Sequence, residues 1–184
     1  MRVIAGTAKR RGLITPRGLA VRPTADRVKE ALFNILGPLV VGCNFLDLYA
    51  GAGAVGIEAL SRGAGQVVFV EKEIGNIRII KKNLQITGLA ENARCLGMSV
   101  NKAITLLSAQ GTSFELIFMD PPYKEALIPD TLKGIAESGL LKPEGAIITE
   151  SGKNASIPEN VAGGLRICRQ EVYSETKITF LSYK

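Results

Sequence analysis

Short apolar runs alternate with stretches of helical periodicity over most of the chain. The apolar runs have the length of buried strands, and the periodic stretches place apolar residues three and four positions apart. Strands separated by helices favour right-handed crossovers and a parallel sheet covered by helices on both faces. The pattern therefore predicts an α/β fold, with strands at Asn44–Ala50, Gln66–Glu71, Ala93–Gly97, Phe114–Met119 and Ala146–Glu150 and helices at Thr24–Leu36, Val55–Arg62, Ile74–Thr87, Val100–Ala109 and Ala126–Ser138.

The pattern changes after Glu150. Two longer segments, Leu165–Tyr173 and Lys177–Tyr183, are separated only by the residues 174–176. Such a short connection leaves no room for a crossover helix, so the two segments are expected to pair as antiparallel strands.

The length of 184 residues and the hydrophobic content of 46% are those of one domain with a sizeable core. The longest stretch without a charged residue, Ala31–Leu46, is too short and too interrupted to cross a bilayer. The first residues contain no long apolar region of the kind found in secretory signals. We therefore expect a single domain over residues 1–184, no membrane association and a cytoplasmic location.

Histidine is absent, and the three cysteines are far apart in the sequence. The absence of histidine excludes Ser-His-Asp hydrolysis, Cys-His proteolysis and histidine-ligated metal catalysis. Three cysteines without a C-x-x-C pair favour neither a disulfide framework nor a zinc site. We expect no metal and interpret the cysteines as small apolar residues.

Basic residues are concentrated at the start of the chain. Residues 1–30 hold eight Lys or Arg and two Asp or Glu, whereas the remaining 154 residues hold 15 of each, so the net charge of +6 lies in the first thirty residues. The Lys9-Arg10-Arg11 run lies among alternating apolar residues, which predicts a small basic hairpin over residues 1–20.

Clustered Lys and Arg bind polyanions by releasing condensed counterions, so this basic hairpin favours a nucleic-acid partner. A merely solvated surface and an anionic membrane surface are the alternatives. We expect removal of residues 1–18 to leave cofactor affinity almost unchanged. The residues predicted to contact RNA are Arg2, Lys9, Arg10, Arg11, Arg17, Arg22 and Arg27.

A G-x-G-x-x-G motif, Gly51 to Gly56, follows the first predicted strand and opens a helix. Its glycines allow a tight turn and a close approach of the backbone to a ligand. Glu71 ends the second strand 20 residues after Gly51, where a carboxylate can accept from both hydroxyls of a ribose. The two features predict an adenosine-containing cofactor, either a nicotinamide dinucleotide or S-adenosylmethionine. Asp47, inside the first strand, favours the cationic S-adenosylmethionine over a pyrophosphate.

The sequence Asp120-Pro121-Pro122-Tyr123 follows the fourth strand, at the edge of the sheet where ligands bind in such folds. An Asp120 oxygen and the Pro121 carbonyl can both accept from one exocyclic amino group, which directs the nitrogen lone pair toward a methyl donor. Tyr123 can stack on a base. We therefore predict a catalytic motif here that acts on an amino group of a base, with Asp120 also facing the cofactor.

Three blocks carry a resemblance to a known family. They are RPTADRVKEALFNIL at Arg22–Leu36, LDLYAGAGAVGIEALSRGA at Leu46–Ala64, and the DPPY motif. Together they resemble the bacterial 16S ribosomal RNA guanine-N2 methyltransferases over essentially the whole chain. The resemblance implies a Rossmann-like class I methyltransferase fold with a seven-stranded sheet in residues 22–184, S-adenosylmethionine as methyl donor, and methylation of a guanine amino group of small-subunit RNA.

The predicted cofactor site departs from the family pattern in one place, because Gly97-Met98-Ser99 stands where many such enzymes have an acid or amide for the adenine. That leaves Ser99 or backbone atoms for this contact. The expected partner is 16S rRNA in the 30S subunit or an assembly intermediate, and the expected state is a monomer. The predicted cofactor-binding residues are Asp47, Ala50, Gly51, Gly53, Glu71, Ser99 and Asp120.

Four other functions remain open on the sequence. A DNA adenine-N6 or a protein glutamine methyltransferase can use the same fold and a DPPY motif. A non-catalytic RNA-binding assembly factor can retain the cofactor fold, and a dehydrogenase can use the glycine motif.

Overall fold

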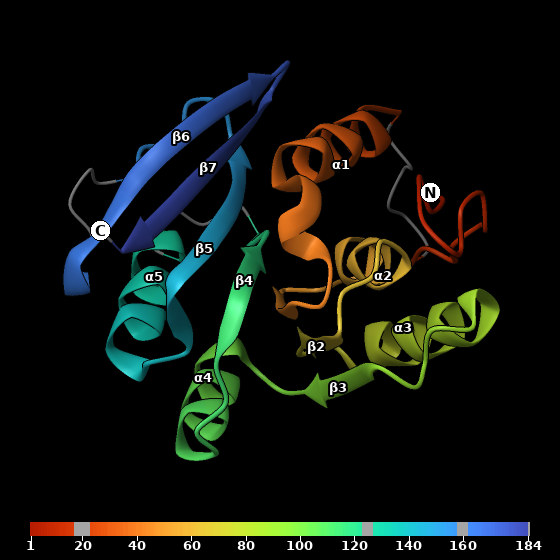
Figure 1. Cartoon of the computed structure of the whole chain (residues 1–184), viewed down its shortest axis with the longest axis horizontal. Helices are drawn as coiled ribbons and strands as arrows, with labels where there is room; N and C mark the ends of the chain where they lie inside the picture. Colours follow the sequence, from red (N-terminus) through yellow and green to blue (C-terminus); the bar gives the residue numbers. More distant parts are fainter. Residues whose placement is uncertain (17–22, 123–126, 158–161, 184) are drawn as a thin grey trace.

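The computed structural model describes residues 1–16, 23–122, 127–157 and 162–183, and these form one seven-stranded sheet flanked by helices (Figure 1). The strand order is β3-β2-β1-β4-β5-β7-β6. The first five strands are parallel, while β7 is antiparallel to both of its neighbours. This confirms the predicted α/β fold class with its antiparallel C-terminal strands. The strands are β1 (Asn44–Leu48), β2 (Gln66–Glu71), β3 (Ala93–Gly97), β4 (Phe114–Met119), β5 (Leu141–Gly152), β6 (Leu165–Tyr173) and β7 (Thr176–Tyr183), and the α-helices are α1 (Pro23–Leu36), α2 (Ala54–Ser61), α3 (Ile74–Thr87), α4 (Val100–Ala109) and α5 (Leu127–Ser138).

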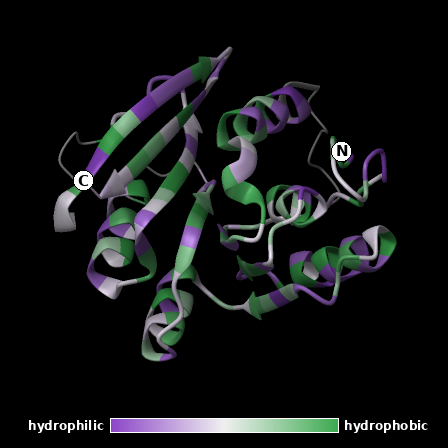
Figure 2. Cartoon of the chain, in the orientation of Figure 1, coloured by the Kyte–Doolittle hydropathy of each residue, from purple (hydrophilic) through white to green (hydrophobic). Residues whose placement is uncertain are grey.

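The core lies in two layers, one on each face of the sheet. Successive strand residues point to opposite faces, so Phe45, Phe69 and Phe118 join the layer beneath α1, α2 and α3. Leu46 and Ile117 join the other layer, against α4 and α5. Hydrophobic residues accordingly predominate in the central strands, whereas hydrophilic residues take up a larger part of the edge strand β6 (Figure 2).

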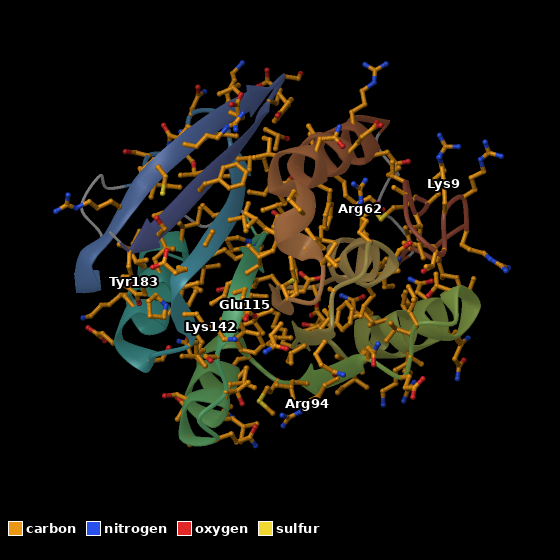
Figure 3. The ribbon with its side chains drawn as sticks, viewed as in Figure 1. Lys9, Arg62, Arg94, Glu115, Lys142 and Tyr183 are labelled. Carbon is orange, nitrogen blue, oxygen red and sulfur yellow. The ribbon has the colours of Figure 1, made fainter. Side chains whose placement is uncertain are left out.

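Two strands differ from their predicted bounds by more than one residue. The first strand ends at Leu48 because Tyr49 has a positive φ of 60°, which breaks the strand. The fifth begins at Leu141 instead of Ala146 and carries a register shift against β4. There Lys142 pairs with Glu115 of β4, as Figure 3 shows, and this contact holds the polar start of β5 against the sheet.

The N-terminal segment (residues 1–16) is hairpin-like, with one antiparallel bridge between Arg2 and Gly12. Its turn is closed by the hydrogen bond from the Arg10 amide to the Val3 carbonyl at 2.9 Å, and Arg10 itself has a positive φ. Val3 and Leu13 are buried in the core layer of α1 to α3. The predicted hairpin is therefore present over residues 1–16, packed against the body of the molecule (Figure 1), and its predicted last residues, 17–20, lie outside the described residues.

Buried charges of the body hold this segment in place. The fully buried Glu58 of α2 accepts hydrogen bonds from the amides of Ile4 and Ala5, at 2.8 and 3.0 Å. The same carboxylate lies 3.3 Å from the Lys29 ammonium and 2.8 Å from the Arg62 guanidinium. Lys29 in turn donates to the Arg2 carbonyl. A buried carboxylate needs such partners, so the N-terminal segment and α1 complete its solvation shell.

Two further polar side chains bind the N-terminal segment. The Ser61 hydroxyl accepts from the Ala8 amide at 3.0 Å. Asn83 of α3, which is fully buried, accepts from the Ile14 amide at 2.8 Å and donates to the Ile14 carbonyl. Asn83 also donates to the carbonyl of Ala52, so one side chain links the segment to the glycine loop after β1.

Candidate active site

A crevice of about 230 Å³ opens at the carboxyl ends of the central strands. It lies between β1 and β4, where the strand order reverses direction, and this is where open parallel sheets bind ligands. Its walls come from the N-terminal segment, from α1, from the loop after β1 and from the ends of β4 and β5. The lining residues include Met1, Thr15, Pro16, Asp26, Lys29, Asp47, Tyr49, Ala50, Gly51, Ala52, Val55, Phe118, Asp120 and Glu150.

The glycine loop shapes the floor of this crevice. Gly53 takes a φ of 77° to cap α2, a conformation that side chains disfavour. At Gly56 an added Cβ would lie 2.3 Å from the Phe69 ring, so only glycine lets α2 pack this closely on β2. The motif therefore serves both the turn and the helix–strand contact, as its spacing predicts.

Glu71, at the end of β2, lies beside this loop. One carboxylate oxygen accepts from the Gly51 amide at 2.9 Å, and the other accepts from the Glu73 amide at 2.8 Å. A carboxylate oxygen has two lone pairs, so each keeps one acceptor position beyond these bonds. The side chain is thereby held in one orientation with two acceptors free for a pair of hydroxyls.

Four carboxyl groups line the crevice and favour a cationic ligand, and the pKa of three of them is raised. Burial raises the pKa of Asp47 to about 7, and the charges of Asp120 and Glu71 add to the rise. The hydrogen bond from the Gly56 amide acts in the opposite direction and lowers it. Burial raises the pKa of Asp120 to about 6, although the residue keeps surface open to water in the crevice. Burial and the Asp120 charge raise the pKa of Glu150 to about 8. A bound cation would stabilise the ionised form of all three.

The prolines of the DPPY motif lie at a second cavity of about 610 Å³. Pro121 is buried and Pro122 is exposed, and both line this cavity, whereas Asp120 lines the first crevice. Asp120 to Pro122 therefore join the two cavities. Tyr123 lies outside the described residues.

The structure brings most predicted cofactor residues together. Asp47, Ala50, Gly51 and Asp120 line the crevice, and Gly53 and Glu71 adjoin it through the glycine loop. Ser99 does not line the crevice. It precedes α4 and is exposed, so its contact with an adenine stays a prediction.

Sequence reasoning missed several polar residues of the crevice, among them Tyr49 and Glu150. Tyr49 lies in the strained region of positive φ, and its hydroxyl is 2.7 Å from that of Thr131. Glu150 lies near the end of β5, beside the end of β4. A signal for Glu150 was available, because an acid at the carboxyl end of a predicted parallel strand lies at the ligand edge.

The predicted RNA-contacting residues gather around the N-terminal segment. Arg2, Lys9, Arg10 and Arg27 line one surface hollow of about 550 Å³, together with Asp26 and Glu30. Arg11 is also exposed. Lys9 extends away from the body in Figure 3. Arg17 and Arg22 lie outside the described residues.

The N-terminal segment also forms part of the crevice wall, through Met1, Thr15 and Pro16. The expectation that residues 1–18 can be removed without affecting the cofactor site therefore does not fit the structure. The sequence shows the charge of this segment but not the Glu58 and Asn83 side chains that bring it to the crevice.

Within the described ranges, no helix is both long and apolar enough to span a membrane. In the same part of the chain, Cys, Asp and Glu side chains form no group of three or more that could hold a metal ion.

Comparison with known proteins places the chain among methyltransferases. The model of the family described as "Conserved hypothetical protein 95" matches residues 1–182. "Putative rRNA methyltransferase YlbH" of Bacillus subtilis (strain 168) is 39% identical over 178 residues, covering 97% of this chain and 96% of that protein. "Ribosomal RNA small subunit methyltransferase D" of Escherichia coli (strain K12) is 35% identical over 188 aligned positions, covering 96% and 93%. The solved structure described as "Putative methyltransferase yhhF from Escherichia coli" is 34% identical, with a TM-score of 0.86, and covers 100% of this chain and 98% of that one.

Proposed function

The chain belongs to the family described as conserved hypothetical protein 95, and on that premise we propose that it is an S-adenosylmethionine-dependent methyltransferase acting on the exocyclic N2 amino group of a guanine in 16S ribosomal RNA. The observation that carries this proposal is the position of Asp120 to Pro122 between two cavities. The first cavity suits a cationic cofactor, and the second is open to a base.

The residues of the first crevice fit S-adenosylmethionine. Glu71 is oriented by two backbone amides with two acceptors free for the ribose hydroxyls. Asp47, Asp120 and Glu150 supply negative charge for the ligand's sulfonium and ammonium groups. When bound, this cofactor supplies an activated methyl group on its sulfur. The chain's own task is then to hold the acceptor amine in line with that methyl.

Asp120 and the Pro121 carbonyl hold the amine by accepting its two hydrogens. This removes the nitrogen lone pair from conjugation with the base and directs it into the first crevice. The amine becomes a strong acid as it is methylated, so Asp120 or water takes the released proton without a histidine. The target base has to be unpaired, because a stacked and paired base cannot enter the cavity.

The exposed basic residues around the N-terminal segment supply the phosphate contacts for this RNA. We propose a small ribosomal subunit or an assembly intermediate as the substrate, a monomeric enzyme and a cytoplasmic location. The hollow lined by Arg2, Lys9, Arg10 and Arg27 shares Asp26 of α1 with the first crevice. RNA bound there is therefore close to the reacting groups.

Transfer of a tritiated methyl group tests the proposed function. Purified protein is incubated with labelled S-adenosylmethionine and with 30S particles, free 16S rRNA, DNA or ribosomal protein, and the products are digested to nucleosides or amino acids. The expected product is N2-methylguanosine from one of the two RNA substrates. Methyladenine in DNA or methylglutamine in protein would replace the proposed substrate, and binding of RNA without transfer would indicate an assembly factor.

Replacing Glu71 by alanine is expected to weaken binding of S-adenosylhomocysteine by about 1–3 kcal/mol, because the variant cannot form charge-assisted hydrogen bonds to the ribose. Isothermal titration measures the change, with Glu73→Ala as a matched control at an exposed carboxylate two residues away. Unchanged affinity in Glu71→Ala would contradict the ribose assignment. Tighter binding of NAD than of S-adenosylhomocysteine by the unaltered protein would indicate a dehydrogenase.

Neutralising Arg10 and Arg11 by glutamine is expected to weaken RNA binding and to reduce its salt dependence by about 0.7–0.9 log unit for each phosphate that is no longer neutralised. These exposed substitutions leave Val3, Leu13 and the Glu58 hydrogen bonds intact, so they avoid the structural damage of a truncation.

The control removes the same charge from the opposite face of the sheet, at the exposed Lys102 of α4 and Lys133 of α5. Affinity is measured at several salt concentrations for both double variants. If both show the same fall in affinity and in salt dependence, Arg10 and Arg11 make no special contact with RNA.

A further inference from the structure

Glu150 is the residue at which the two cavities meet. It lines the first crevice of about 230 Å³ together with Asp120, and it also lines the second cavity of about 610 Å³ together with Pro121 and Pro122. A group in this position can contact whatever base places its amine at Asp120. Neither the glycine motif nor the DPPY motif includes it.

The sheet register brings Glu150 beside Asp120. Met119 of β4 pairs with Thr149 of β5, and Asp120 and Glu150 are the next residues along the two segments. Neighbouring strands lie about 4.8 Å apart, so two carboxyl groups stand side by side at the junction of the cavities. At this separation the Asp120 charge adds to the effect of burial in raising the pKa of Glu150.

A pair of neighbouring acceptors matches one nucleobase. The Watson–Crick edge of guanine carries two adjacent donors, the N2 amine and N1–H. Adenine and cytosine each present an amine beside a ring nitrogen that only accepts, and uracil has no amine. An ionised carboxylate can only accept, so a second one beside Asp120 attracts guanine N1–H and repels the ring nitrogen of adenine or cytosine. Glu150 also lines the cationic-ligand crevice, so a cation bound there favours this ionised form.

We propose that Glu150 selects guanine by accepting a hydrogen bond from N1–H while Asp120 holds the N2 amine. This inference rests on the proposed function. It assigns Glu150 as a specificity-determining residue of that reaction, and it explains how a site built to hold an amine rejects the amines of adenine and cytosine.

Base replacement at the methylated position tests the assignment. The position that the unaltered enzyme methylates is mapped first, and 30S particles are then reconstituted with guanine or 2,6-diaminopurine at that position. Diaminopurine keeps the N2 amine but presents an acceptor at N1. The unaltered enzyme is expected to prefer guanine by about 10- to 100-fold in kcat/KM, as for a base contact of this kind.

In Glu150→Gln the side-chain amide can donate to N1 of diaminopurine. The preference for guanine is therefore expected to fall by about 10- to 100-fold in kcat/KM, or to reverse. Glu150→Asp, which keeps the charge, is expected to retain the preference at a lower rate. Glu175→Gln is the matched control, since Glu175 lines the far part of the same cavity and is exposed there. Its preference is expected to match that of the unaltered enzyme.

Binding of S-adenosylhomocysteine to each variant is measured in parallel to show that the protein is folded and its first crevice intact. An unchanged guanine preference in Glu150→Gln would overturn the assignment while leaving the proposed function in place. Absence of transfer to guanine by the unaltered enzyme would instead contradict the proposed function, so the two failures are distinguishable.

Discussion

Replacing Asp120 by alanine is expected to lower the single-turnover rate of methyl transfer by about 10²- to 10⁴-fold, because alanine can neither orient the amine nor receive its proton. Asp120 lines the crevice at the end of β4, next to the two prolines of the second cavity. Its proposed partner is the amine in the transition state, so the effect is expected in the rate of transfer at saturating RNA. Quenched-flow transfer to 30S particles measures this rate.

Asp120→Asn separates the two contributions of this side chain. The amide keeps an acceptor oxygen but cannot take a proton, so a rate between those of the unaltered enzyme and of Asp120→Ala is expected. S-adenosylhomocysteine affinity is expected to change little in either variant, because Glu71 and Asp47 remain. A near-normal transfer rate in Asp120→Ala would rule out this residue as the group that holds the amine.

Replacing Glu58 by alanine is expected to destabilise the folded protein by about 3–5 kcal/mol, the usual cost of leaving a buried ion without its partner. Glu58 is fully buried, and its carboxylate is the partner of Lys29, Arg62 and the amides of Ile4 and Ala5. Urea denaturation monitored by circular dichroism measures the free energy of unfolding.

The pH dependence of this variant provides its control. Burial lowers the pKa of Lys29, and the Glu58 carboxylate partly offsets this effect by raising it. In Glu58→Ala the pKa of Lys29 is therefore expected to fall further. A lysine whose pKa is lower in the folded state binds fewer protons there than in the unfolded chain, so stability rises with pH. The deficit of Glu58→Ala is therefore expected to shrink as the pH is raised from about 7 to about 10, toward the ordinary pKa of lysine. A deficit that is small or independent of pH would show that Lys29 has another anionic partner or reaches water.

Most of the fold could be predicted from the sequence because its signals are local. The strand at Gln66–Glu71 and the helix at Ile74–Thr87 have the predicted bounds, since hydrophobic period and turn residues suffice to define them. The early start of β5 could not be predicted in this way. Its first residues, Leu141 to Gly145, do not form an apolar run, and they join the sheet through the contact between Lys142 and Glu115, 27 positions earlier.

The candidate site was predictable where a motif has a fixed spacing, as for Gly51, Glu71 and Asp120. Residues whose role depends on which strands become neighbours were missed. Glu150 matters because β5 pairs with β4, and Tyr49 because its backbone turns sharply after β1. The place of the N-terminal segment in the crevice wall was also missed, because Glu58 and Asn83 lack any local sequence signal for their long-range hydrogen bonds.

These long-range hydrogen bonds also bear on the order in which the chain folds. Ile4 bonds to Glu58, 54 positions later, and Ile14 bonds to Asn83, 69 positions later. During synthesis the first sixteen residues leave the ribosome well before α2 and α3 exist to receive them. Closing such long loops is slow, so the apolar side chains of Val3 and Leu13 stay in water until the first half of the sheet has assembled. The crevice therefore lacks the wall formed by Met1, Thr15 and Pro16 until a segment that is synthesised before α2 and α3 has docked on them.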